Sequence, residues 1–265
     1  MLGRTIRVLS EVRRSLPSPN NTSTIIHRNN FSSKSRTQDE EAISRLLTIA
    51  TARQLKGDIS DAISFANQAL TKQREQGDDC DSGAIADTTT FLGKLFRLDG
   101  QYDNAEESFR EGHSLYQSVN PGGREEYIGL VHIASIQSIT GETSQAEESL
   151  WAAAKGLEEL VGWSDGMTNH AYFELSELYK GMGRKEEAVR VLSKMKAGLV
   201  TVFGSDHAKA VQINCEMAEI KVLLGDIKGA MELLEEVGDI LPPNSPEARR
   251  AFLRLEDLKE EPCGS

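Results

Sequence analysis

The chain has 265 residues, of which 38% are hydrophobic and 27% are charged, and its formal net charge is −11. No run of 18 apolar residues occurs, which excludes a membrane-spanning helix, and the acidic balance argues against nucleic acids and anionic lipid surfaces as partners. The three cysteines, Cys80, Cys215 and Cys263, lie far apart and are odd in number, so they indicate neither a disulfide framework nor a paired metal site.

Residues 1–37 differ from the rest of the chain in charge and composition. They hold seven basic residues against one acid, Glu11, which leaves 23 basic and 40 acidic residues and a net charge of −17 in the remainder. The apolar residues spaced for one side of a helix are Leu2, Ile6, Leu9, Val12 and Leu16. A serine-rich stretch without acids follows. This composition predicts a disordered organelle transit peptide over 1–37, and the basic amphipathic helix favours mitochondria and a matrix location. A chloroplast transit peptide and a plain disordered tail are the alternatives.

From residue 43 onward, one pattern occurs five times at intervals of 41 to 43 residues. An alanine is preceded by a glycine five residues earlier and by a small residue twelve earlier. The alanines are Ala62, Ala105, Ala146, Ala188 and Ala230, and the glycines are Gly57, Gly100, Gly141, Gly183 and Gly225. The glycine suits the place where one helix stops and the chain reverses, because left-handed backbone angles are open to it. The small residues allow two antiparallel helices to approach closely.

The rest of the pattern is also helical. Apolar residues four and seven positions after each alanine continue a buried stripe. The one strand-like run, GLVTVFG at 198–204, is interpreted as the end of a helix and its turn. The sequence therefore predicts an all-α fold, a right-handed α-solenoid of about five helix-turn-helix units spanning 38–242. The units are predicted over 43–77, 83–118, 126–160, 168–202 and 208–240.

The pattern resembles the tetratricopeptide repeat. LGKLFRLDGQYDNAEESFREGHSLY and LSELYKGMGRKEEAVRVLSKM carry its small residue, glycine, alanine and apolar positions in order. The usual period is about 34 residues, and the longer period here is similar to that of kinesin light chain-like proteins. FGSDHAKAVQINCEMAEIKVLLGD looks like that subclass, with Ala208 where a proline is usual. The resemblance covers about 43–240, and repeats one and three depart from it at Arg53 and Gln137, where an aromatic residue is common.

Residues 243–260 predict one further helix. Ser245 is suited to the N-cap, Pro246 to the first helical position and Glu247 to the first turn. Ala248, Phe252 and Leu255 are expected to form an apolar stripe that covers the last repeat as a C-terminal cap. Residues 261–265 are predicted to form a short tail.

No group of residues indicates catalysis. The five histidines, His27, His113, His132, His170 and His207, are scattered, without an HExxH-like pair, and no GxSxG, Walker or GxGxxG motif occurs. Cys215 and His207 form the one nucleophile–base pair to consider, but a turn and a helix separate them. The sequence therefore predicts that the protein is not an enzyme and uses no cofactor and no metal.

The tetratricopeptide resemblance implies a concave face, lined by the first helix of each pair, that binds an extended peptide or a partner helix. The residues predicted to line this groove are Thr90, Lys94, Arg97, Val131, Ser135, Ser138, His170, Phe173, Glu177, Lys180, Gln212 and Glu219. The same register adds Ser44, Leu47, Thr51, Asp87 and Cys215. In co-chaperone repeats that clamp a carboxylate, one position of the first helix is basic, and in kinesin-type repeats the same position is often asparagine. In this chain the corresponding position is neither basic nor asparagine in any repeat. Chaperone-tail binding and light-chain cargo recognition are therefore not expected.

These features predict a non-catalytic protein-binding scaffold or adaptor in mitochondria. It would assist the assembly or stability of a protein complex by holding a peptide or helix of another protein. The complex-assembly role is what the resemblance implies, since some kinesin light chain-like repeat proteins of mitochondria act on respiratory complexes. The alternatives are a chloroplast assembly factor and a helical-repeat factor of organelle RNA metabolism, which would need a basic groove. No oligomeric state is predicted.

Overall fold

The computed structural model describes residues 26–77 and 80–260, which contain eleven helices and no strand. The helices are α1 (Ile26–Lys56), α2 (Ile59–Glu75), α3 (Ser82–Leu98), α4 (Tyr102–Val119), α5 (Arg124–Thr140), α6 (Thr143–Val161), α7 (Gly166–Gly181), α8 (Lys185–Phe203), α9 (Ala208–Leu223), α10 (Ile227–Ile240) and α11 (Pro246–Glu260). The strand-like run at 198–204 is the end of α8, as predicted.

The predicted transit peptide lies mostly outside the described residues. Its last part, residues 26–37, belongs to the backbone of α1, whereas the sequence led us to expect no regular structure there. The physical reason is the lack of a stop signal, because no proline or glycine occurs between Pro19 and Gly57. The helix that forms the first repeat therefore continues upstream of it.

Each helix pair is joined by a turn built on the predicted glycine. The φ angles of Gly57, Gly100, Gly141, Gly183 and Gly225 are +84°, +77°, +89°, +73° and +78°. In the first turn Asp58, the residue after the glycine, donates its backbone N–H to the Arg53 carbonyl at 3.0 Å. The equivalent hydrogen bond occurs in the other four turns at 2.8–2.9 Å. The bond satisfies a carbonyl that the end of the helix leaves open.

The core lies between the helices of each pair and between neighbouring pairs. All five repeat alanines have no exposed surface. The close approach is clearest between α3 and α4, where a Cβ added to Gly93 would lie 2.6 Å from the Phe109 ring. The largest group of buried side chains runs through α5 to α9 and includes Leu150, Tyr172 and Leu192.

The helix α11 covers the last repeat, with one difference from the expected stripe. Ser245 caps it, since its Oγ accepts a hydrogen bond from the Ala248 N–H at 3.1 Å. Phe252 is 59% exposed, so its predicted burial is wrong. Residues Ala248, Ala251, Leu255 and Leu258 form the buried stripe. Adjacent helical residues point about 100° apart, so a stripe that contains Ala251 turns Phe252 toward solvent.

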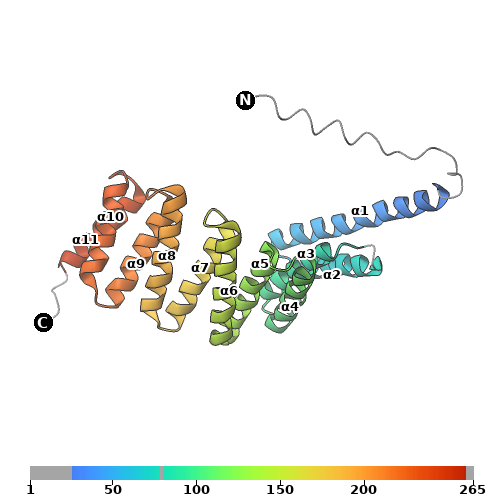
Figure 1. Ribbon diagram of the computed structural model, residues 1–265, viewed down its shortest axis with the longest axis horizontal. Helices are drawn as coiled ribbons and strands as arrows, with labels where there is room; N and C mark the ends of the chain where they lie inside the picture. The colour runs from blue at the N-terminus through green and yellow to red at the C-terminus, as the bar shows by residue number, and fades with distance from the viewer. Residues whose placement is uncertain (1–25, 78–79, 261–265) are drawn as a thin grey trace, which may run out of the picture.

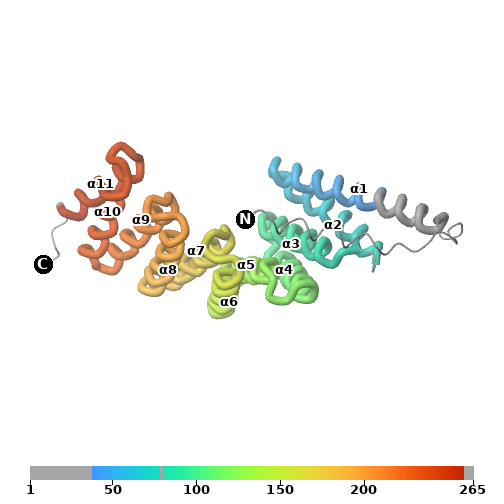
Figure 2. The backbone as a smooth tube through the Cα atoms, turned by 45° about the horizontal axis from the view of Figure 1, so that its top comes forward, coloured from blue at the N-terminus to red at the C-terminus, as the bar shows by residue number. Residues whose placement is uncertain are grey.

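The helix pairs stack in chain order, each helix packing on the next (Figure 1). Figure 2 shows that the array is curved: its ends, α1 and α11, rise toward the same side, and α4, α6 and α8 lie on the outer side of the curve. The structure is therefore an α-solenoid of five helical hairpins with a terminal helix. Within the described residues, no helix has the length and apolar character needed to cross a bilayer.

Candidate protein-binding groove

The first helices of the hairpins, α3, α5, α7 and α9, face the hollow of the curve (Figure 2). Ten of the twelve predicted groove residues lie on these helices with exposed or half-buried side chains: Lys94, Arg97, Ser135, Ser138, His170, Phe173, Glu177, Lys180, Gln212 and Glu219. Thr90 and Val131 are only 7% and 1% exposed, so they are not available to a partner. Thr90 packs against Gly112 of α4, and Val131 belongs to the core.

The second hairpin carries two groove cations that form no ion pair with another described residue. Among the described residues, neither Lys94 nor Arg97 of α3 forms an ion pair, whereas most arginines do. Burial and the neighbouring Arg97 lower the pKa of Lys94, against a smaller opposing effect of Asp87. Asp87 itself accepts a hydrogen bond from the Tyr116 hydroxyl. This part of the groove therefore presents positive charge that Asp87 offsets only in part.

His132 of α5 lies beside Lys94 and Arg97. The sequence analysis did not identify it as a groove residue. Its ring stacks on Phe109, with 5.0 Å between ring centroids. Burial, followed by the charges of Lys94, Arg97 and His170, lowers its pKa to about 3. The imidazole is therefore neutral at physiological pH. Its Nε2 is buried and has no hydrogen-bond partner in the described part of the chain.

The charges of the C-terminal half of the groove are paired across successive helices. Lys180 of α7 contacts both Glu177 and, at 2.5 Å, Glu216 of α9. Glu219 of α9 accepts from Arg254 of α11 at 3.1 Å, so α11 stands where the first helix of a sixth hairpin would. Lys180 and Glu219, two predicted groove residues, thus also link neighbouring hairpins, whereas Glu177 pairs with Lys180 within α7.

Two hollows lie at the ends of the groove. One has a volume of about 540 Å³ and lies between α9 and α11. Its apolar lining includes Val211, Leu234 and Ala251. Cys215 lines it, and burial, together with Glu219, raises the pKa of its thiol. No hydrogen bond joins Cys215 to His207 in the described residues, and His207 stacks on Phe203 instead. The other hollow, of about 520 Å³, lies between α1, α2 and α3.

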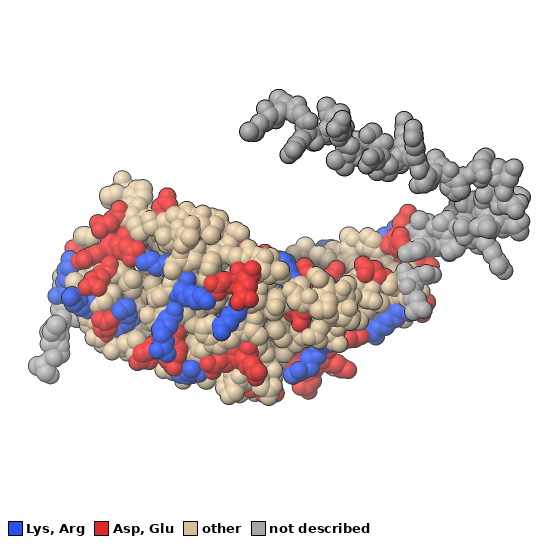
Figure 3. Space-filling view, viewed as in Figure 1, with Lys and Arg blue, Asp and Glu red and all other residues tan. Residues whose placement is uncertain are grey.

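The described residues hold no cluster of three or more histidine, cysteine, aspartate or glutamate side chains suited to a metal ion. Charged side chains of both signs are interspersed on the face of the molecule seen in Figure 3. The geometry is that of a long, shallow, mixed-polarity surface, which suits a chain segment better than a small substrate.

Comparison with known proteins agrees with this geometry. Residues 170–194, which cover most of α7 and the start of α8, match the tetratricopeptide repeat family. No curated protein matches the chain. The described fold is an all-helical solenoid of tetratricopeptide-type repeats, the class of architecture to which solved kinesin light chain-type repeat proteins also belong.

Three solved structures illustrate the likeness. A Podosopora anserina protein described as a kinesin light chain with nearly identical TPR-like repeats has a TM-score of 0.64 at 19% identity, covering 75% of this chain and 93% of that one. BtubC (BKLC) from P. vanneervenii has a TM-score of 0.60 at 16% identity, with 76% and 83% covered. YrrB, a TPR protein with an unusual peptide-binding site, has a TM-score of 0.50 at 16% identity, with 83% and 97% covered.

Proposed function

We propose that this protein is a non-catalytic scaffold that holds a peptide segment or helix of another protein in its concave groove. The observation that carries the proposal is that Lys94 and Arg97 lie on the groove helix α3 without forming ion pairs to other described residues, in a body whose net charge is −17. A half-buried charge without a partner is unfavourable in the free protein, and polar groups of a bound segment would compensate it.

The setting that we propose is the mitochondrion, where the scaffold assists the assembly or stability of a protein complex. The basic, serine-rich and acid-poor composition of residues 1–37 supports this location. An RNA partner is the second hypothesis. The acids Asp87, Glu174, Glu177 and Glu216 on the same first helices favour a protein partner over a polyanion, because sequence-independent RNA affinity comes from neutralising phosphates.

The test is affinity capture from isolated mitochondria, comparing the wild type with a Lys94→Glu, Arg97→Glu variant. We expect one or a few proteins to be captured by the wild type and lost in the variant. Lys180 is left unchanged because its ion pair with Glu216 supports the fold. The matched control reverses two cations of the second helices, Lys155→Glu and Lys185→Glu, and should capture the same proteins as the wild type. An unchanged set of proteins in the groove variant would contradict the proposal.

A further inference from the structure

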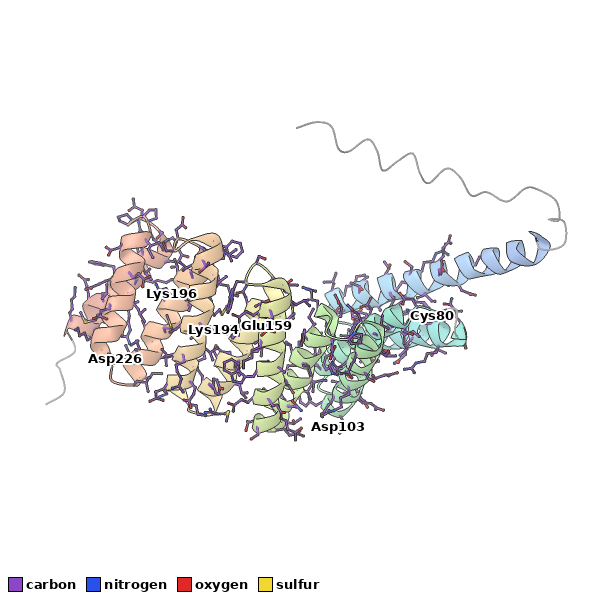
Figure 4. The ribbon with its side chains drawn as sticks, in the orientation of Figure 1. Cys80, Asp103, Glu159, Lys194, Lys196 and Asp226 are labelled. Atoms are coloured by element: carbon purple, nitrogen blue, oxygen red, sulfur yellow. The ribbon has the colours of Figure 1, made fainter. Side chains whose placement is uncertain are left out.

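The hollow between the first two hairpins has two glutamine side chains in its wall. Its walls include Ile43 and Leu47 of α1, Gln73 of α2, Gln76 directly after α2, and Ala84 of α3. Cys80, labelled in Figure 4, also lines it and lies in the connection between α2 and α3. The volume of about 520 Å³ is within the range of ligand sites, about 300–1,000 Å³, and far above the roughly 30 Å³ of one water molecule.

Gln73 stands where the other repeats have large apolar or aromatic residues. It follows its repeat alanine by eleven positions, and its equivalents are Tyr116, Leu157, Leu199 and Leu241. Leu157 and Leu199 are 0% and 1% exposed, so the chain fills these inner junctions with its own hydrocarbon. Gln73 is also buried, at 4% exposure, but it places an amide beside an open hollow.

The amides of Gln73 and Gln76 have unmet hydrogen-bonding capacity. Gln73 Nε2 donates to the Ala84 carbonyl at 3.2 Å, which orients the side chain, while its Oε1 is buried without a partner in the described residues. Gln76 Nε2 is likewise buried and unpartnered there. Each unmade bond of this kind costs about 1–3 kcal/mol of stability. Two residues that line the hollow therefore carry one unmet acceptor and one unmet donor, at a cost to the free protein.

We propose that this hollow binds the main chain of an extended segment of a partner protein. A peptide unit offers one N–H donor and one C=O acceptor, which are the complements of Gln73 Oε1 and Gln76 Nε2. Ile43 and Leu47 line the same hollow and provide an apolar surface for a neighbouring aliphatic side chain of the segment. This inference rests on the proposed function and deepens it, because it places one end of the bound segment at the first hairpin.

The experiment titrates the purified, ¹⁵N-labelled full chain with N-acetyl-Ala-Leu-Ala N-methylamide. The side-chain amide resonances of Gln73 and Gln76 are followed by NMR. We expect a saturable shift of both resonances. An analogue in which an ester oxygen replaces the leucine N–H should bind about five- to tenfold more weakly, the effect of losing roughly one hydrogen bond. No saturable shift, or equal binding of the ester, would overturn the proposal.

Variants separate this site from a hollow that holds water alone. Gln73→Leu introduces the residue of three other repeats, so it should raise the melting temperature and abolish binding of the capped peptide. Gln76→Leu should also lose binding, whereas Gln68→Leu, a substitution of an exposed residue on the same helix, should bind like the wild type. If Gln73→Leu raises the melting temperature and still binds, the capped peptide binds elsewhere on the chain and the proposal is wrong. The titration uses no natural partner, so its failure leaves the capture experiment with Lys94 and Arg97 unaffected.

Discussion

Burial keeps one histidine beside the groove cations of α3 uncharged. His132 stacks on Phe109 and lies near the two unpaired cations of α3, and its pKa is lowered to about 3. Desolvation disfavours the charged imidazolium, and the nearby positive charges of Lys94 and Arg97 act in the same direction. The ring therefore adds an uncharged, partly apolar surface to a cationic part of the groove.

The lowered pKa predicts that His132 makes the fold sensitive to acid. In the unfolded chain a histidine binds a proton near pH 6.5, whereas the folded protein resists this until about pH 3. The unfolded state thus binds more protons between these values, and folding stability falls as the pH falls, by up to about 1.4 kcal/mol per pH unit. Urea unfolding at pH 7 and pH 5 should show the wild type losing about 2 kcal/mol more than His132→Gln. Equal losses would show that His132 takes up its proton in the folded state.

The burial of individual groove residues depends on their neighbours, which explains what sequence reasoning missed. Register along a helix gives the direction of a side chain, since each residue turns by about 100°. The register of a helix does not show how deeply a side chain is buried. Thr90 is buried because Gly112 opposite it has no side chain to hold α4 away, and a Cβ there would lie 2.5 Å from Thr90 Oγ1. Gln73 was overlooked because three helices together enclose it.

At the scale of helices, the boundaries with local signals could be predicted and the others could not. Five turn glycines with positive φ mark the reversals, and Ser245 and Pro246 mark the start of α11. The start of α1 has no such signal, and it lies upstream of the predicted repeat. The buried face of α11 was predicted imperfectly, because an amphipathic helix with both Phe252 and Leu258 offers two possible stripes, and packing on α10 selects one.

Two substitutions in α11 test which stripe holds the cap. Leu258 is 3% exposed, so Leu258→Ala should destabilise the protein by about 2–4 kcal/mol through lost burial and a cavity. Phe252→Ala removes a larger side chain that is 59% exposed and should change stability by no more than about 0.5 kcal/mol. Denaturant unfolding followed by circular dichroism measures both. A larger effect at Phe252 would restore the stripe expected from the sequence.

At the scale of the whole molecule, ion pairs join neighbouring hairpins on both sides of the curve. On the second helices, Lys194 of α8 pairs with Glu158 of α6, and Lys196 pairs with Glu236 of α10, both at 2.7 Å. The two lysines are labelled in Figure 4. On the first helices, Lys180 and Glu216 form the corresponding link. Partly exposed pairs contribute little stability each, about 0–1 kcal/mol. They link adjacent hairpins, whose packing on one another sets the curvature of the groove.

The hydrophobic core is distributed unevenly along the solenoid. The core through α5 to α9 contains large residues such as Tyr172, Leu175 and Met195, whereas the first hairpin is held mainly by small ones, including Ala50, Ala62 and Ala66. The first junction also contains the hollow beside Gln73. In a solenoid each hairpin is stabilised by itself and its neighbours, so stability need not be uniform. The first hairpin should therefore open more easily than the centre.

Hydrogen exchange measured by mass spectrometry tests this gradient. Amides of α1 and α2 should exchange through local opening, well before those of α7 and α8, whose exchange should approach the rate set by global unfolding. Gln73→Leu supplies an internal control, because filling the hollow should slow exchange in α1 to α3 and leave α7 and α8 unchanged. Uniform protection along the chain would mean that the five hairpins unfold as one unit, and the first hairpin would then be as rigid as the centre. If the first hairpin opens more easily than α7 and α8, it can move to close over one end of a bound segment. The rest of the groove would keep its shape.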